Sequence, residues 1–289
     1  MERKKKIISF AISIILVVGS LTGCGVENNK DTISVVTREE GSGTRGAFVE
    51  LTGVVAMDEN GNKVDFTTVE AISVNSTAIT MTTVAGNNRA IGYISLGSLN
   101  NTVKAVQIDG VEPTAENIKN GSYILSRPFY VVTKKNLSKP AKDFIHFILS
   151  ADGQTNITEN GYIEVNNIGT FVSNGARGKV IVSGSSSVTP IMQKLQEAYQ
   201  AINTNVKVEV QESDTTTGIN STINGTCDIG MASRELKDEE ASQGLAATAI
   251  AMDGIVVVIH NDNKITDLTT NQVKDIFTGK VTCWSEVKK

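Results

Sequence analysis

The stretch KVIVSGSSSVTP, residues 179–190, decides the fold of this chain. Its first four residues predict a short strand, and the residues after Pro190 carry apolar side chains at helical spacing. The loop between them offers backbone N–H groups, hydroxyl donors and the positive end of a helix dipole, which together suit an oxyanion. A strand, such a loop and a helix in this order indicate an α/β fold.

Two further stretches repeat this pattern. TREEGSGTR, residues 37–45, follows the strand-like residues 33–36 and enters a helical pattern. It adds Arg38, whose guanidinium matches planar and tetrahedral oxyanions. The polar residues 212–218 follow the alternating strand 206–210. Each loop alone would be an ordinary capped helix, but their recurrence predicts one shared anion site beyond the carboxyl ends of the strands.

The rest of the chain alternates strand-like and helix-like segments, as an α/β fold requires. The predicted strands are 90–96, 103–108, 127–133, the buried start of 227–235, and 254–259. The predicted helices are 114–118, 141–149 and 273–277, besides those that follow the three loops. Residues 169–178 are rich in glycine and polar side chains, and we interpret them as a linker.

The N-terminus has the pattern of an export signal. Residues 2–6 are basic, residues 7–21 are apolar, and Leu-Thr-Gly-Cys closes the segment at Cys24. This ending resembles the bacterial lipobox and predicts a signal peptide at 1–23, lipidation of Cys24 (palmitate) and a tether at 24–30. The alternative is an uncleaved anchor, although the apolar run is short for a spanning helix. Both interpretations place the protein outside the cytoplasm, attached to a membrane.

Composition narrows the possible partners. A formal net charge of −4 argues against nucleic acid, since no basic stripe would neutralise phosphates. His146 and His260 lack neighbours at metal-ligand spacing, so we expect no metal and no cofactor. Cys227 and Cys283 could form a disulfide or remain two buried thiols.

At these residues the chain resembles the phosphate-binding lipoprotein of bacterial phosphate ABC importers, a type II periplasmic binding protein. The segments that carry the resemblance are 38–44, 90–93, 184–190, 228–234, 277–279 and 284–285. The resemblance implies two α/β lobes joined by two hinge strands, which close around one dehydrated phosphate. It implies a monomeric solute-binding protein that delivers phosphate to permease subunits, and no enzymatic activity.

The resemblance also implies the phosphate contacts. These are Arg38, Ser42, Gly43, Thr44, Ser186, Ser187, Thr215 and Ser233. Arg38 would give a charged bidentate contact, and the others would give hydroxyl or backbone N–H donors. Gly218 would preserve the turn after Thr215.

One position departs from the family pattern. Some members have an Asp where this chain has Ser233, and that Asp accepts the proton of a protonated phosphate. A hydroxyl can also accept a hydrogen bond, but it repels a fully ionised anion less, so we expect weaker selection against sulfate. The possible substitute acceptors are Glu39, Glu40, Asp214 and Asp253, each of which we expect to be a solvated surface carboxylate instead. Arg234 either adds charge at the mouth of the site or pairs with Glu235.

The order of the segments departs as well. The family usually starts at the segment that matches 184–190 and reaches the one that matches 38–44 later. Joining Lys289 to Asp31 restores that order, and residues 169–178 then bridge the family's usual ends. This pattern predicts a circular permutation, which surface loops tolerate. The alternative is a truncated tandem gene.

The permutation predicts the lobes. Residues 127–260 would form a continuous lobe, and residues 31–126 plus 261–289 a split lobe. The hinge strands would be 127–133 and 254–260. Cys227 and Cys283 would lie on different lobes, where a disulfide would restrain opening, so we favour two thiols.

Two other functions compete with phosphate transport. A surface serine hydrolase could use Ser186 or Ser42 as nucleophile, but neither histidine lies in a recognisable partner motif. A surface anion sensor or adhesin without a transport role is the other alternative.

Overall fold

The computed structural model describes residues 31–287, so the predicted signal peptide and the whole predicted tether at 24–30, including Cys24, lie outside the described residues. The strands are β1 (Ser34–Arg38), β2 (Val55–Met57), β3 (Lys63–Asp65), β4 (Ile72–Val74), β5 (Ala90–Ser95), β6 (Lys104–Ala105), β7 (Gln107–Ile108), β8 (Ser126–Lys134), β9 (Ile163–Glu164), β10 (Gly178–Ser185), β11 (Val206–Ser213), β12 (Ile229–Ala232), β13 (Leu245–Ile259) and β14 (Asp267–Leu268). The α-helices are α1 (Gly43–Leu51), α2 (Thr77–Ala85), α3 (Ala115–Lys119), α4 (Lys139–Leu149), α5 (Ala151–Glu159), α6 (Thr189–Ile202), α7 (Thr215–Asn224), α8 (Asp238–Ala241) and α9 (Thr270–Phe277). Within residues 31–287 no helix has the length and apolar character needed to cross a bilayer.

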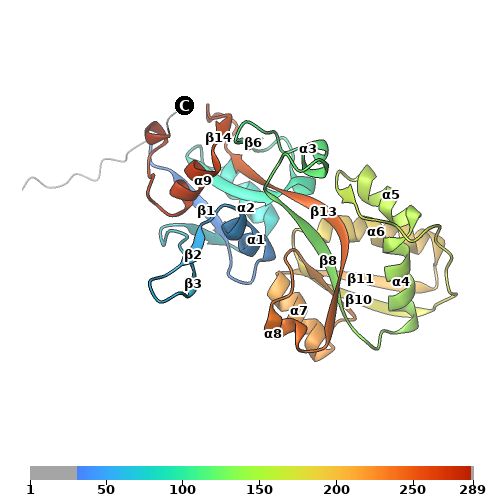
Figure 1. The fold of residues 1–289 in the computed structure, drawn as a ribbon. Coiled ribbons are helices and arrows are strands. Elements are labelled where there is room, and N and C mark those ends of the chain that lie inside the picture. Colours follow the sequence, from blue (N-terminus) through green and yellow to red (C-terminus); the bar gives the residue numbers. More distant parts are fainter. Residues whose placement is uncertain (1–30, 288–289) are drawn as a thin grey trace, which may run out of the picture. The chain divides into compact units, whose positions relative to one another are not determined.

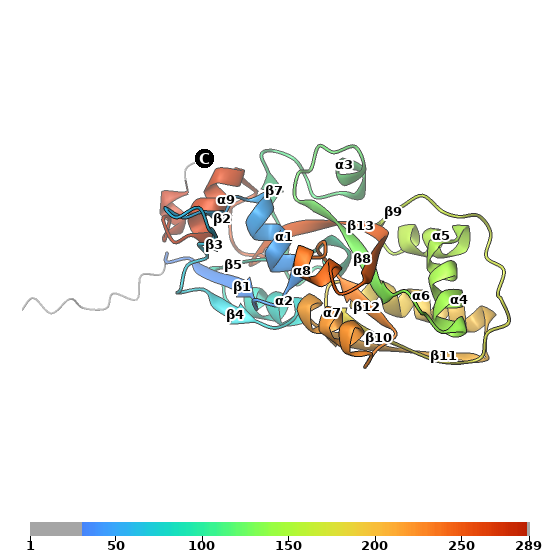
Figure 2. The same ribbon diagram turned by 60° about the horizontal axis from the view of Figure 1, so that its bottom comes forward.

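One 10-stranded sheet runs through the described part. Eight of its strands follow the order β11-β10-β12-β8-β13-β5-β1-β4, and the short strands β6 and β9 each pair with β13. The strands at each end are parallel, β11-β10-β12 on one side and β5-β1-β4 on the other. Between them β8 and β13 pair antiparallel and run side by side across the middle (Figures 1 and 2). The α/β class is confirmed, and the parallel halves explain why anion-friendly loops recur at strand ends.

Two large hydrophobic cores lie on either side of this central pair. One is built around Phe144, Phe147 and Tyr199, where α4 and α6 pack beside β10 and β11. The other is built around Phe48, Tyr93 and Phe277, whose rings stack or meet edge to face. Two cores joined by paired strands make a two-domain fold of the predicted kind.

β13 is longer than the sequence pattern indicated. Within the apolar run 254–259, Ile255–Ile259 pairs with β5, while Leu245–Gly254 pairs with β8. The residues Ile255, Val257 and Ile259 pack into the core that contains Phe48, although the predicted boundary assigned them to the continuous lobe. His260 lies outside the strand. Most of residues 245–252 are small or partly exposed, which hides the first half of the strand from a hydrophobicity pattern.

The third predicted loop is shorter than expected. β11 continues to Ser213 and α7 starts at Thr215, so Asp214 alone separates them and caps the helix by accepting from Thr217 N. Gly218 therefore lies in α7 and not in a turn. A Cβ on Gly218 would lie 2.6 Å from Gly184 Cα, so glycine is required there by the close approach of α7 to β10.

The two ends of the described range lie side by side. Thr32 and Cys283 form an isolated β-bridge, and Ile33 N donates to the carbonyl of Thr282 at 2.7 Å. Trp284 N donates to the carbonyl of Asp31 at 3.0 Å. The segment that begins at Asp31 is thus held against residues 282–284.

Candidate anion-binding site

A cluster of hydroxyl groups joins the two cores. The Oγ1 atom of Thr44, on α1, lies 2.7 Å from Ser187 Oγ in the loop before α6. The Oγ1 atom of Thr77, the first residue of α2, lies 3.1 Å from the same Ser187 Oγ. The N–H of Thr77 donates to Ser186 Oγ at 3.3 Å. Each of these four side chains is almost fully buried, so the loops predicted from the sequence do face each other.

The cluster continues towards α7 through Ser233, Ser185 and Thr215. Ser185 Oγ donates to Ser233 Oγ at 2.9 Å, and Ser233 N donates to Thr215 Oγ1 at 3.2 Å. Gly43 packs directly against this side, because a Cβ there would lie 2.5 Å from Thr215 Oγ1 and 2.7 Å from Ser233 Oγ. Only a residue without a side chain fits between α1 and α7 at this distance.

Four helices begin beside the cluster, and each directs the positive end of its dipole there. α1 is capped by Ser42, whose hydroxyl accepts from Arg45 N, and α2 is capped by Ser76 in the same way through Ile79 N. α6 begins at Thr189 without a side-chain cap, and α7 is capped by Asp214. The arrangement suits a small anion, since helix N-termini bind anions through free N–H groups.

Arg38 supplies the positive charge. It ends β1, is 2% exposed, and its Nε and Nη2 donate to the two carboxylate oxygens of Glu39 at 2.8 and 2.7 Å. Its Nη1 donates to Thr77 Oγ1 at 3.4 Å, which is a long contact. The guanidinium therefore lies at the hydroxyl cluster with one edge held by a carboxylate.

The structure places the predicted contacts Arg38, Ser42, Gly43, Thr44, Ser186, Ser187, Thr215 and Ser233 in or beside this one buried cluster. Thr77 is not among the contacts predicted from the sequence. Its signal was present, because Asn75-Ser76-Thr77 follows β4 and starts a helix, like the other hydroxyl-rich junctions. The segment was overlooked because β4 is a three-residue strand with exposed residues.

The carboxylates were predicted incorrectly in part. Asp253 was expected to be a solvated surface group, but it is 1% exposed and forms an ion pair with Arg127 at 3.2 Å. Burial raises its pKa to about 6, although the nearby guanidinium of Arg127 opposes this shift. Glu39 is partly buried against Arg38, and Asp214 is the cap of α7, whereas Glu40 is exposed.

Arg234 lines the cleft beside the cluster, and its Nη1 donates to the backbone carbonyl of Glu235 at 2.8 Å rather than to the Glu235 carboxylate. Its two terminal nitrogens donate to the Glu240 carboxylate at 2.8 Å, and Nη2 also donates to Thr216 Oγ1 at 3.2 Å. Thr216 in turn donates from its N–H and its hydroxyl to the carbonyl of Gly41, each at 3.1 Å. Arg234 thus orients a residue that links α7 to the loop before α1.

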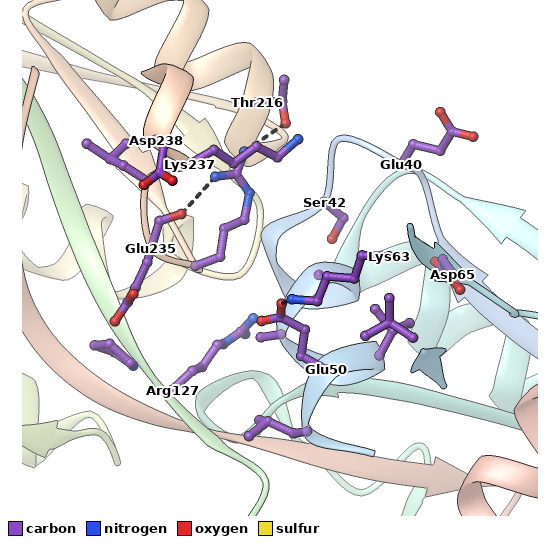
Figure 3. Close-up of a pocket in the computed structure, with 18 of the residues that line it drawn as sticks. Glu40, Ser42, Glu50, Lys63, Asp65, Arg127, Thr216, Glu235, Lys237 and Asp238 are labelled. Carbon is purple, nitrogen blue, oxygen red and sulfur yellow. Dashed lines mark hydrogen bonds and ion pairs between the residues drawn. The ribbon is translucent and has the colours of Figure 1, made fainter. Parts of the chain in front are cut away.

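A cleft of about 820 Å³ opens beside these contacts. Ser42 and Thr216 extend into it from different elements, and Arg127 lines its floor (Figure 3). Of the predicted phosphate contacts, Ser42 lines this cleft, so the cleft borders the start of α1.

The chemistry of the site favours binding over catalysis. The cluster hydroxyls contact other hydroxyls, Arg38 and backbone groups. His260 lies beside Asp262, and His146 packs near Phe171. Among residues 31–287 no cluster of His, Cys, Asp and Glu could hold a metal ion. Cys227 is a buried free thiol and so forms no disulfide with Cys283.

Known proteins share this sequence and fold. A family model described as a PBP superfamily domain matches residues 26–152 and 170–289. The phosphate-binding protein PstS 2 of Streptococcus agalactiae is 51% identical over 293 residues, covering 100% of both chains. A crystal structure of a phosphate-binding protein of a phosphate ABC transporter from Streptococcus pneumoniae superposes with a TM-score of 0.69 at 45% identity, covering 89% of this chain and 100% of that one.

A more distant relative matches only in part. The phosphate-binding protein PstS of Staphylococcus saprophyticus is 36% identical over 126 residues, which is 41% of this chain and 40% of that protein. The full-length matches, the two-core fold and the buried hydroxyl site agree with one another. The chain belongs to the PBP superfamily and, within it, to the family of phosphate-binding proteins that includes its streptococcal relatives.

Proposed function

We propose that this protein captures inorganic phosphate between its two lobes and delivers it to an ABC importer. The observation that carries the proposal is the convergence of Arg38 and the starts of α1, α2, α6 and α7 on one buried hydroxyl cluster. The names of the streptococcal relatives support phosphate as the anion.

The contacts follow from the chemistry of each group. Arg38 would give charge-assisted hydrogen bonds to two phosphate oxygens. The hydroxyls of Ser42, Thr44, Ser186 and Thr215, and the N–H groups of Gly43 and Ser187, would donate to the others. Ser233 would contribute a hydroxyl that can donate or accept. We add Thr77, because its hydroxyl lies between Arg38 and Ser187.

Both lobes would contribute contacts to one ligand bound between them. The contacts from Thr44 and Thr77 lie on the predicted split lobe, and those from Ser186, Ser187 and Thr215 lie on the predicted continuous lobe. A ligand held by both sides favours the closed arrangement, since it can only shift the equilibrium towards the state that binds it better. The central β8 and β13 pair would then serve as the hinge.

The predicted location fits this role. An export signal at 1–23 with lipidation of Cys24 would hold the protein on the outer face of the membrane, close to permease subunits. Treating cells with labelled palmitate and comparing the wild type with Cys24→Ala tests the anchor. Loss of both label and membrane association in the variant is expected, and retention of either would contradict it.

We also propose the circular permutation. The contact between Asp31 and Trp284 supports it, because the family's usual order needs a connection there. The staphylococcal relative supports it too, since a permuted chain aligns with an unpermuted one over one segment at a time. A chain that starts at Lys179, ends at Ala176 and joins the present ends by a short linker should fold and bind phosphate. Failure to fold with several linker lengths would contradict the permutation.

Isothermal titration of the full chain in detergent tests the function. We expect saturable phosphate and arsenate binding at one site, with measurable sulfate competition because Ser233 is not a carboxylate. Molybdate serves as a larger tetrahedral control. Sulfate binding without phosphate binding would overturn the assignment.

A further inference from the structure

A second buried arginine lies where the two cores meet. Arg127 on β8 and Asp253 on β13 are cross-strand partners, and their side chains are 3% and 0% exposed. On one side of the pair, Leu125 and Ile255 belong to the core around Phe48. On the other side, Phe129 and Ala251 belong to the core around Phe144. The ion pair therefore marks the point at which β8 and β13 pass from one lobe to the other.

Each member of the pair also contacts groups outside it: Asp253 accepts from Ser95 and from the N–H of Gly97, and Arg127 donates in the opposite direction. Asp253 Oδ1 accepts from Ser95 Oγ at 2.8 Å, at the end of β5. Arg127 Nη1 donates to the carbonyl of Ser233 at 3.1 Å, directly after β12. A continuous chain of contacts thus runs from Ser95 through the ion pair to Ser233.

Ser233 connects this chain to the anion site. Its hydroxyl accepts from Ser185, and its N–H donates to Thr215. Because Gly43 packs against both Thr215 and Ser233, a small shift of the Ser233 backbone would change the distance between α1 and α7.

Stability alone does not account for this pair. Arg127 Nε is buried and has no hydrogen-bond partner in the described part of the chain, and Arg127 otherwise packs over the ring of Phe129. A buried ion pair with an unsatisfied donor is often no more stable than an apolar replacement of the same volume.

We infer that Arg127 is a positioning residue: held by Asp253 at the hinge, it fixes the Ser233 carbonyl and so couples lobe closure to anion binding. This inference rests on the proposed phosphate site. It assigns Arg127 no contact with the anion, only the placement of a residue that has one. The role of the ion pair would be to hold Ser95 and Ser233 in fixed positions when the lobes close.

The test separates positioning from stability. Arg127→Met alone leaves the Asp253 charge buried without its partner, so melting temperature and phosphate affinity should both fall. The triple variant Arg127→Met, Asp253→Leu, Ser95→Ala replaces the whole buried polar chain by apolar groups and should regain most of the melting temperature. Its phosphate affinity should stay about tenfold weaker than that of the wild type, the loss expected for one misplaced hydrogen-bonding residue. Wild-type affinity in the triple variant would overturn the inference.

Hydrogen exchange without phosphate gives a second readout on the full chain. In the triple variant, amides of residues 229–235 should exchange about tenfold faster, while those of α4 and α6 stay unchanged. Unchanged exchange at 229–235 would also overturn the inference. If the wild type binds no phosphate, the proposed function fails, and the exchange result alone decides whether Arg127 fixes Ser233.

Discussion

Arg38 and Arg127 are both almost completely buried, but their charges are neutralised in different ways. The partner of Arg38 is its sequence neighbour Glu39, whose side chain is 23% exposed. The partner of Arg127 is Asp253, on another strand and fully buried. Arg38 also meets only a long contact at Thr77, so its guanidinium can exchange that bond for a stronger one with an anion. The difference shows that a buried arginine can serve ligand capture or architecture, depending on how firmly its partner is held.

The largest expected effect is a loss of phosphate affinity when Arg38, the arginine proposed to bind the ligand, is replaced. Arg38→Met would remove the two charge-assisted bonds proposed to phosphate, so affinity should fall about 100-fold or more, at ~1.5–3 kcal/mol for each bond. Isothermal titration measures this, and Arg38→Lys should fall in between because an ammonium cannot bind in a bidentate manner. A smaller loss in Arg38→Met than in Arg127→Met would reverse the roles assigned to the two arginines.

The second effect concerns the pH dependence of folding stability that arises from Asp253, the partner of Arg127. Burial raises the pKa of Asp253 to about 6, above the value of 3.8 that an exposed Asp has. Between these values the folded state binds more protons than the unfolded state, so stability falls as pH rises from about 4 to about 6. Asp253→Asn removes this contribution, which amounts to at most about 3 kcal/mol at ~1.4 kcal/mol for each pKa unit.

Urea unfolding at pH 4.5 and pH 7.5 measures this second effect. The wild type should lose stability between the two pH values relative to Asp253→Asn. An identical pH dependence in both proteins would mean that folding does not raise the pKa of Asp253.

Gly43→Ala tests whether the region of Arg38 works by direct contact between the lobes. The added Cβ would lie 2.5 Å from Thr215 Oγ1, so closure should be hindered and phosphate affinity should fall about tenfold. Gly46→Ala on the same helix is the matched control, since its Cβ would lie 3.5 Å from Arg234 Cδ, an ordinary contact. Equal affinities in the two variants would show that the close approach at Gly43 is not needed for binding.

The smallest expected effect is the loss of phosphate affinity when the Thr77 hydroxyl, which contacts Arg38, is removed. Thr77→Val keeps the side-chain shape but loses the hydroxyl, so affinity should fall about fivefold, or ~1 kcal/mol. Thr80→Val is the control, because Thr80 bonds only to the backbone of its own helix at Ser76. If both variants bind like the wild type, Thr77 does not touch the ligand.

The sequence predicted the α/β class and the convergence of the hydroxyl loops because both rest on local patterns. Gly-Ser-Ser-Ser after an apolar strand needs no distant information, and neither does Arg-x-x-Gly-Ser-Gly-Thr. Thr77 was missed because its strand, β4, is short and half-exposed, so the hydroxyl-rich start of α2 does not follow an apolar run as the other loops do. Asp253 was judged incorrectly because its burial depends on Arg127, which lies far away in sequence and meets it only in the paired strands.

Hydroxyl groups from the two cores are hydrogen-bonded to each other, so an anion can bind only if these hydroxyls exchange their present hydrogen bonds for bonds to the anion. Thr44 with Ser187, and Thr77 with Ser186 and Ser187, already satisfy one another. An anion that enters replaces neutral bonds by charge-assisted ones, which are about twice as strong. The net gain is therefore the difference between two kinds of bond. Because hydroxyl protons rotate to suit their acceptors, release needs no new donors, only the return of the same hydrogens to their former partners.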